Sequence, residues 1–495
     1  MKNPLAELLL AAAVTTLMPA TGLCEAAAGT NLIDVASSAN CTTDPAASTT
    51  IAGWTTIAGS PALWCRSVAG IGGAGAAAIA PGRIISGPYG SSALERDIDL
   101  GPAGRAIEDG TATYRLSGWL GATGSPTARA SLTVIFRDAA GRPLPGSVRI
   151  ESPPAAAQPA YADRSASGTV PRRARSMRVV LRLEAGAGPK RGSAYAARLG
   201  LSLQPDLPAP AAAPPPSTVP RFDHVFLIFM ENTSYQQVMG DAADAPFIHQ
   251  LAAQGTLLAN YTAVYHPSDE NYLAVADGDT AVRGAVYFPH IHLTLRHLGD
   301  SLEAAGKSWK AYEQGMGTPC NTTTRYDKYY EPDDAPFVNF IDVIGDPQRC
   351  QAHLADTKTL VSDLRSAATT PDFAWIAADD FDDGEDAGNG SPASLRAQDA
   401  WLKRTLTPLF ASAAWRTQRS LLILTWDESS STTTNHVAAI LTGSRGSVRR
   451  GFVSRTRYDH YSTGRTIENA LGLPAFTAND AFARPINDAF VTPPR

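Results

Sequence analysis

HVFLIFMEN, residues 224–232, is a run of apolar side chains that stops abruptly at a carboxylate and an amide. An uninterrupted apolar run of this length is typical of a strand buried on both faces, as in a parallel sheet. In open α/β sheets, ligands lie outside the carboxyl ends of the strands. The sequence therefore places Glu231 and Asn232 where a domain of this class carries out its chemistry.

Two later segments repeat the pattern of an apolar strand followed by acidic residues. They are 420–426 with Asp427 and Glu428, and 373–378 with Asp379 and Asp380. Acidic residues also follow strands as ordinary turn or helix-capping residues, which is the alternative explanation. Carboxylates gathered at one sheet edge repel one another unless a cation holds them, so three such pairs favour a hard divalent metal.

The length of 495 residues exceeds what one hydrophobic core normally serves, which predicts two domains. Prolines concentrate in residues 205–220, a composition typical of a semi-rigid, extended linker. We therefore expect one domain at 29–204 and a second at 221–495. The formal net charge of −5 provides no basic field for nucleic acid.

Residues 29–204 are rich in small residues and contain short alternating segments separated by turn signals, without helical periodicity. This pattern predicts an all-β sandwich. The strand-like segments include 112–120, 131–136 and 177–183. The order of segments from 31–33 through 53–54 to 117–119 loosely resembles bacterial galactose-binding-like jelly rolls. This resemblance implies contact with a glycan or the cell envelope; a spacer without a ligand is the alternative. The aromatic residues that either stack on sugars or belong to the core are Trp54, Trp64 and Trp119.

Residues 1–28 have the pattern of a secretory signal peptide. Lys2 precedes an apolar segment at 8–18, and small residues follow it. The apolar segment is too short for a transmembrane helix. Leu23 is too bulky for the position before a lipidated cysteine, so we expect Cys24 to leave with the signal. The expected location is periplasmic or secreted, with no transmembrane segment.

Four cysteines remain after the signal, in a compartment that allows disulfides. Three pairings of four cysteines are possible, and proximity along the chain favours one bridge in each expected domain. The favoured pairs are Cys41 with Cys65, and Cys320 with Cys350.

Strand and helix signals alternate after the linker, which predicts an α/β domain with a doubly wound, mostly parallel sheet and helices on both faces. The expected helices are 246–255, 293–306, 397–413 and 462–471, and further expected strands are 256–261 and 437–442.

Ser268 follows a proline and precedes a helix-compatible run. A serine at this position directs its hydroxyl toward the positive end of the helix dipole, which favours an alkoxide, and a metal held by nearby carboxylates favours it further. The alternative is that Ser268 is only a helix N-cap, the commonest role for such a serine.

Six motifs in the second domain together resemble the bacterial phosphoesterase family, which includes phospholipases C and acid phosphatases and belongs to the alkaline phosphatase-like superfamily. The resemblance spans roughly residues 221–490 and keeps the family's order. The motifs are 230–235, 245–248, 266–274, 426–428, 435–437 and 460–462.

This resemblance implies a metal site and a covalent phosphoryl-serine intermediate. Ser268 would be the nucleophile, with Asn271 beside it and His460 near the phosphate, while His266 and His436 would support the site. The metal ligands that the resemblance implies are Glu231, Asn232, Asp427 and Glu428. The resemblance does not decide whether the divalent metal is Ca, Mg or Zn.

The sequence departs from the family pattern at segments that usually carry histidines. The family's Asp-x-His-Asp segment corresponds to the acidic run 379–386, which lacks histidine, and the histidine-containing segment before Pro-Phe corresponds to 331–337. Asp269 and Glu270 also replace a residue and a proline after the serine. These departures have two possible explanations. In one, the acidic segment binds additional metal and the enzyme prefers a different substrate from other family members; in the other, the enzyme turns its substrate over slowly.

These features predict an exported, metal-dependent phosphoesterase that hydrolyses phosphate esters, of either phosphatase or phospholipase C type. The alternative from another class is a catalytically impaired envelope- or glycan-binding protein that works through its N-terminal sandwich.

Overall fold

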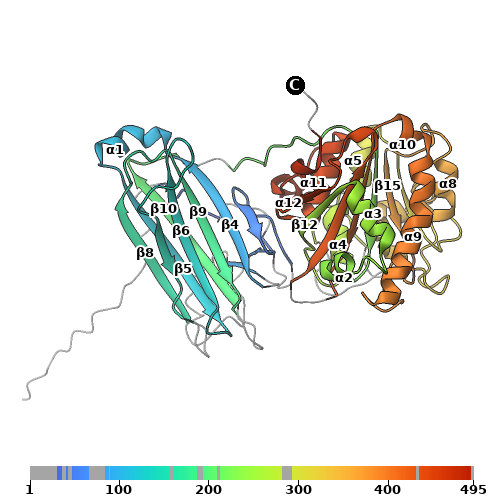
Figure 1. Cartoon of the computed structure of the whole chain (residues 1–495), viewed down its shortest axis with the longest axis horizontal. Helices are drawn as coiled ribbons and strands as arrows, with labels where there is room; N and C mark the ends of the chain where they lie inside the picture. Colours follow the sequence, from blue (N-terminus) through green and yellow to red (C-terminus); the bar gives the residue numbers. More distant parts are fainter. Residues whose placement is uncertain are drawn as a thin grey trace, which may run out of the picture.

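The computed structural model of the chain describes residues 30–35, 41–42, 47–65, 84–87, 90–154, 160–186, 193–208, 212–280, 292–430 and 434–491 (Figure 1). The predicted signal peptide, including Cys24, lies outside the described residues. Among the helices in the described ranges, none combines the length and the apolar character needed to span a bilayer.

The first half of the chain forms two antiparallel sheets of five strands each. One has the order β1-β4-β9-β6-β7 and the other β2-β3-β10-β5-β8. The strands are Thr55–Ala58 (β1), Ala62–Trp64 (β2), Ile84–Ser86 (β3), Ser92–Asp99 (β4), Thr113–Thr123 (β5), Arg129–Arg137 (β6), Val148–Glu151 (β7), Ala160–Thr169 (β8), Ser176–Glu184 (β9) and Ser193–Gln204 (β10).

Alternate side chains of these strands point into a shared core, as the period of a β-strand requires. Leu132, Val134 and Phe136 of β6 are buried there together with Leu116 and Leu120 of β5 in the other sheet. The short alternating segments predicted at 112–120, 131–136 and 177–183 fall within β5, β6 and β9. The narrower resemblance to a galactose-binding-like jelly roll stays a prediction.

Two of the three tryptophans in question belong to the core. Trp54 is 5% exposed and Trp64 is 7% exposed, and the indole N–H of Trp64 donates to Ser86 Oγ at 2.6 Å. Trp119 is half-buried and packs against the small cluster around Trp64. The predicted glycan contact therefore gains no support from these side chains and stays a prediction.

The second half contains a nine-stranded mixed sheet with the order β14-β13-β15-β11-β16-β17-β12-β18, and β19 also pairs with β12. All the paired strands run parallel except β17, which is antiparallel to both β16 and β12. The strands are His224–Met230 (β11), Thr256–Thr262 (β12), Trp309–Glu313 (β13), Leu354–Asp356 (β14), Phe373–Ala377 (β15), Ser420–Trp426 (β16), His436–Gly443 (β17), Phe452–Ser454 (β18) and Tyr458–Asp459 (β19).

Helices cover both faces of this sheet, as predicted. Phe229 of β11 packs against Tyr272 and His460 on one face, each at 5.2 Å between ring centroids. The next residue of β11, Met230, pairs in register with Trp426 of β16, so the Trp426 side chain lies on the opposite face of the sheet from Phe229. Its indole N–H donates to Gln398 Oε1 on that face at 2.9 Å. The helices of this half include Tyr235–Gly240 (α2), Pro246–Gln254 (α3), Asp269–Ala276 (α4), Leu298–Ala304 (α5), Pro347–His353 (α7), Pro392–Ala411 (α9), His460–Leu471 (α11) and Ala478–Phe482 (α12).

Two predicted helices have different bounds in the structure. The helix expected at 293–306 is only α5, and α9 begins at Pro392, before the expected start at 397. The N-cap Ser391, whose hydroxyl accepts a hydrogen bond from Ser394 N–H at 3.2 Å, sets the start of α9. The structure contains both predicted disulfides, Cys41–Cys65 and Cys320–Cys350.

Residues 47–65 of the first half contact the second half directly. Ser48 N–H donates to Val264 O at 3.1 Å, and Arg457 Nε–H donates to Gly59 O at 2.9 Å. The Thr50 hydroxyl donates to Asn479 O at 3.0 Å. The two halves are therefore joined through polar contacts as well as through the linker.

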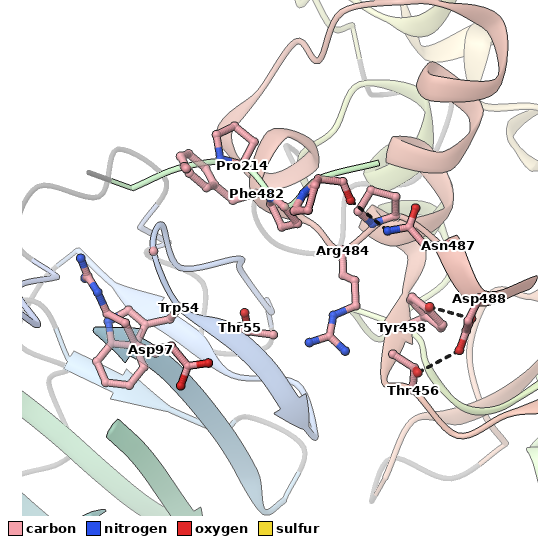
Figure 2. Close-up of a pocket in the computed structure, with 16 residues that line it drawn as sticks. Trp54, Thr55, Asp97, Pro214, Thr456, Tyr458, Phe482, Arg484, Asn487 and Asp488 are labelled. Carbon is pink, nitrogen blue, oxygen red and sulfur yellow. Dashed lines mark hydrogen bonds between the residues drawn. The ribbon is translucent and has the colours of Figure 1, made fainter. Parts of the chain in front are cut away.

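A pocket of about 530 Å³ lies between the two halves, beside the proline-rich linker. Figure 2 shows Trp54 and Asp97 on the side of the first half, and Arg484, Tyr458 and Asp488 on the side of the second. Tyr458 donates to Asp488 Oδ1 at 2.8 Å. The residues lining this pocket include none of the predicted catalytic or metal-binding residues.

Candidate functional site

The carboxyl ends of β11 and β16 bring two of the predicted acidic segments together. The strands pair in parallel up to Met230 and Trp426, so the residues that follow them are neighbours. Asp427 N–H donates to Met230 O at 2.9 Å, and Asn232 N–H donates to Asp427 Oδ1 at 2.9 Å. Glu231 and Asp427, nearly two hundred residues apart in the sequence, therefore share one edge of the sheet.

The Ser268 hydroxyl points at this acidic edge. Ser268 occupies the N-cap position of α4, but its side chain forms no capping hydrogen bond. Its hydroxyl donates instead to Glu231 Oε2 at 3.1 Å, and it is near enough to Asp427 to lower the pKa of that carboxyl. The purely capping explanation of Ser268 therefore does not account for the direction of its hydroxyl.

Two buried carboxylate oxygens at this edge lack hydrogen-bond partners within the described part of the chain. They are Glu231 Oε1 and Asp427 Oδ2, on side chains that are 2% and 0% exposed. Buried polar atoms are normally paired, so each of these oxygens is left with an unused bonding capacity. Asn232 and Glu428 add further oxygen atoms at the same strand ends, and oxygen is the donor type that a hard divalent cation takes.

The pKa values of these carboxyl groups are raised, because the groups are buried and lie close to other negative charges. Burial raises the pKa of Glu231 well above its usual value, and the charges of Asp427, Asp334 and Asp383 raise it further. Burial and the Glu428 charge raise the pKa of Asp427 to about 7, against the hydrogen bond from Ser268. Burial and the Glu385 charge raise the pKa of Glu428 to about 8.

The predicted third acidic strand end also reaches this edge, and it brings residues that the sequence motifs did not indicate. Asp383, beyond β15, accepts a hydrogen bond from Glu231 N–H through its backbone carbonyl at 3.2 Å. Asp269, in the first turn of α4, is 7% exposed, and burial with the charges of Asp333 and Glu270 raises its pKa to about 9. Glu313, at the end of β13, is fully buried.

Asn271 and His460, both predicted to be catalytic, form hydrogen bonds within the protein. Asn271 Oδ1 accepts hydrogen bonds from Val264 N–H and Tyr265 N–H, both at 3.0 Å, and its amide donates to Tyr265 O and Pro267 O. Asn271 therefore holds the loop that precedes Ser268. Its predicted catalytic role stays a prediction.

His460 lies next to Asn271, and its predicted place near the phosphate stays a prediction. Its imidazole is 0% exposed, with Nδ1 at 3.2 Å from Asn271 Oδ1 and Nε2 at 3.1 Å from Trp426 O. Burial lowers the pKa of His460 to about 4, so the ring is neutral at neutral pH and supplies no charge to an anion. It connects Asn271 to the end of β16.

The two histidines predicted to support the site lie at different depths. His266 Nδ1 pairs with Glu428 Oε2 at 2.5 Å and so restrains one predicted metal ligand. His436 stacks on Tyr235 with 4.5 Å between ring centroids, and its Nε2 lies 3.1 Å from Ala259 O. His436 therefore contributes to packing between β17 and α2.

Comparison with known proteins agrees with the motifs around this site. The model of the phosphoesterase family matches residues 241–474. A phosphatidylinositol-3-phosphatase from Mycobacterium tuberculosis is 30% identical over 273 residues, which cover 55% of this chain and 84% of that protein. The chain belongs to the phosphoesterase family. Family membership confirms the predicted enzyme class, a hydrolase acting on phosphoric ester bonds.

Other relatives cover the same part of this phosphoesterase. A probable acid phosphatase from Kluyveromyces lactis is 29% identical over 274 residues, covering 53% of this chain and 61% of that protein. A solved protein of the alkaline phosphatase superfamily from Vibrio parahaemolyticus is 12% identical, covering 55% of this chain and 71% of that one, with a TM-score of 0.39.

Proposed function

We propose that the chain is an exported, metal-dependent phosphoesterase that transfers the phosphoryl group of its substrate to Ser268. The observation that carries this proposal is the Ser268 hydroxyl, which forms no capping hydrogen bond and donates to the buried carboxylate of Glu231 beside Asp427. Phosphate monoesters and phospholipid head groups are the two substrate classes, because relatives include a phosphatidylinositol-3-phosphatase and a probable acid phosphatase.

The proposed roles of the side chains follow from their contacts. Ser268 Oγ attacks phosphorus while Glu231 Oε2, which already accepts its hydrogen bond, takes the proton. The Oγ–P bond forms as the bond from phosphorus to the ester oxygen breaks, and the ester oxygen takes the proton from Glu231 and leaves as an alcohol. Water then displaces Ser268 Oγ from phosphorus and gives up a proton to it, so that free serine is restored. A phosphate monoester yields inorganic phosphate, and a phospholipid yields its phosphorylated head group.

The second oxygens of these carboxylates are available for a cation. Glu231 Oε1 and Asp427 Oδ2, with Asn232 and Glu428, would hold a divalent metal. When bound, the metal supplies positive charge for the phosphoryl oxygens and the serine oxygen. Asn271 and His460 keep the loop before Ser268 in place beside it.

A pair of serine variants tests the nucleophile against the capping explanation. Ser268→Ala should keep the free energy of unfolding, because this side chain caps nothing, but lower kcat on an aryl phosphate by about a thousandfold or more. Ser391→Ala should do the reverse, costing about 1 kcal/mol of stability while activity persists, since Ser391 does cap α9.

Trapping of a phosphorylated enzyme by acid quench should succeed with the wild type and with Ser391→Ala, and fail with Ser268→Ala. Parallel assays on a phosphatidylcholine analogue, with and without chelator, separate the two substrate classes and test the need for metal. A folded Ser268→Ala variant that keeps most of the wild-type rate would refute the proposed mechanism.

A further inference from the structure

Four carboxylates gather beside the site on segments that do not include the predicted metal ligands. Glu313 ends β13, Asp380 and Asp383 follow β15, and Asp334 lies at the end of the 3-10 turn Pro332–Asp334. One oxygen from each of Asp334, Asp380 and Asp383 lies within 4.8 Å of the others. Oxygens that bind one Ca²⁺ at roughly 2.4 Å lie no more than about 4.8 Å apart, so this spacing suits a shared cation.

Glu313 supplies an independent indication of a ligand. Its side chain is 0% exposed, and neither carboxylate oxygen has a hydrogen-bond partner among the described residues. Glu313 is the charge that acts most strongly on Asp334, and Asp383 and Asp380 act most strongly on Glu313, so its carboxylate faces this group. The side-chain amide of the neighbouring Gln314 donates hydrogen bonds to Asp379 Oδ2 at 2.7 Å and to Asp382 Oδ2 at 2.9 Å, but it donates none to Glu313.

Protein cations neutralise only one member of this group. Arg325 pairs with Asp380 at 2.9 Å, yet no lysine or arginine in the described ranges forms an ion pair with Glu313, Asp334 or Asp383. A second cluster, formed by His297, Asp300 and Asp342, shows the contrast. There Arg349 binds Asp300 at 2.6 Å and Asp342 at 2.7 Å, so that cluster needs no metal.

We propose that Glu313, Asp334, Asp380 and Asp383 form a second cation site that takes a hard divalent ion of the Ca²⁺ type. Four carboxylates without nitrogen or sulfur donors match the oxygen ligands that Ca²⁺ prefers. The site adjoins the first one, since Glu231 N–H donates to Asp383 O at 3.2 Å.

The role of this second site rests on the proposed phosphoesterase function. The charges of Asp427, Asp334 and Asp383 already act on Glu231 beside Ser268, and a phosphate ester brings further negative charge. Asp334 and Asp383 lie in the two segments, 331–337 and 379–386, where the family pattern usually carries histidines. A cation held there restores positive charge that the sequence has lost, and so lets the anionic substrate approach.

The test counts bound metal and locates it. Wild-type protein, stripped with chelator and reloaded with Ca²⁺, should retain two equivalents in elemental analysis, and Glu313→Gln should retain one. Asp300→Asn, in the cluster that Arg349 already satisfies, is the matched control and should retain two. Asp334→Asn, on a half-buried residue, serves if Glu313→Gln fails to fold.

Terbium luminescence gives a readout that is independent of activity. The Trp375 indole N–H donates to Asp334 O at 2.8 Å, so tryptophan excitation should sensitise Tb³⁺ bound at this site. In an Asp427→Asn background, which disables the first site, Glu313→Gln should weaken the Tb³⁺ titration by more than about tenfold. Unchanged Ca²⁺ stoichiometry and Tb³⁺ affinity in both Glu313→Gln and Asp334→Asn would overturn the second site.

The two proposals fail in different ways. If Asp427→Asn removes all bound Ca²⁺ and Glu313→Gln removes none, the second site is wrong and the first stands. If Glu313→Gln removes Ca²⁺ while Asp427→Asn keeps every equivalent, the second site stands and the assigned first site is wrong.

Discussion

The two oxygens of Asp427 have different partners, and this difference makes the residue a sensitive test of the first metal site. Oδ1 accepts the backbone N–H of Asn232, whereas Oδ2 is buried and has no hydrogen-bond partner among the described residues. An asparagine can keep the first contact through its amide oxygen. It replaces the second oxygen by an N–H donor, which cannot bind a cation.

Asp427→Asn should therefore lose one equivalent of tightly bound metal in elemental analysis while remaining folded. Asp399→Asn is the control, because Asp399 is also buried in the same domain but accepts Ile248 N–H at 2.8 Å, a bond that asparagine retains. Equal metal content in Asp427→Asn and the wild type would show that Asp427 is not a ligand.

His460 predicts a pH dependence of stability. Its folded pKa of about 4 lies below the usual value of about 6.5, because burial disfavours the imidazolium. Between these pH values the unfolded chain binds more protons than the folded one, so stability falls as pH falls. The contribution is fully present above pH 6.5 and is lost progressively toward pH 4, up to about 3 kcal/mol.

His460→Gln removes this titration. We expect the difference in unfolding free energy between wild type and His460→Gln to shrink by about that amount when urea unfolding at pH 7 is compared with pH 4. A difference that does not change with pH would contradict a neutral, buried His460.

At the scale of elements, the sheet order explains why so many carboxylates meet. β15 lies between β13 and β11, and β16 lies on the other side of β11. All four strands are parallel, so their carboxyl ends face the same way. Each of these strands ends in or next to an acidic residue, which places Glu313, Asp380, Glu231 and Asp427 along one edge.

The Cys320–Cys350 disulfide ties α7 to the irregular segment that carries Asp334. It closes a loop over a separation of 30 residues, so replacing both cysteines by alanine should cost about 3 kcal/mol. We also expect weaker Tb³⁺ binding at the second site, because the loop that positions Asp334 becomes less restricted.

The Cys41–Cys65 bridge offers a matched control, with a separation of 24 residues in the other half of the chain. Its double alanine variant should lose similar stability without a change in Tb³⁺ affinity. Identical Tb³⁺ titrations for both double variants would show that the Cys320–Cys350 bridge does not position the cation site.

At the scale of the whole molecule, the N-terminal half supports the loop that leads to Ser268. Ala47 packs with Val264, Tyr265 and Tyr461 in a small buried cluster. Ser48 N–H donates to Val264 O, and the Tyr461 hydroxyl donates to Ser48 O at 3.1 Å. The sandwich therefore contacts the same residues that Asn271 holds from the other side.

Tyr461→Phe should loosen this contact. We expect a loss of about 1 kcal/mol in unfolding free energy and faster hydrogen–deuterium exchange in peptides covering 47–65. Tyr458→Phe is the control: Tyr458 is similarly buried but donates to Asp488 within its own half, so exchange at 47–65 should stay unchanged. Equal exchange in the two variants would argue against support through Tyr461.

The sequence by itself was sufficient for the features that depend on local pattern. The apolar runs of β11, β15 and β16 indicated buried strands, and the acidic residues directly after them indicated the active edge. Parallel strands align their ends without further information, so Glu231 and Asp427 could be brought together from the sequence alone. The family motifs added the expected roles, and short separations along the chain indicated both disulfides.

Only the tertiary structure decided which side chains face the site and which lie behind it. His460 and Asn271 belong to family motifs, yet their hydrogen bonds turn them toward the loop before Ser268, and no spacing rule reveals that direction. Glu313 and Asp334 lie on a short strand and a 3-10 turn without a periodic signal. Glu313 comes beside β15 because β13 pairs with it, and Asp334 does so because its carbonyl accepts the Trp375 indole N–H, two long-range contacts that the order of residues along the chain does not specify.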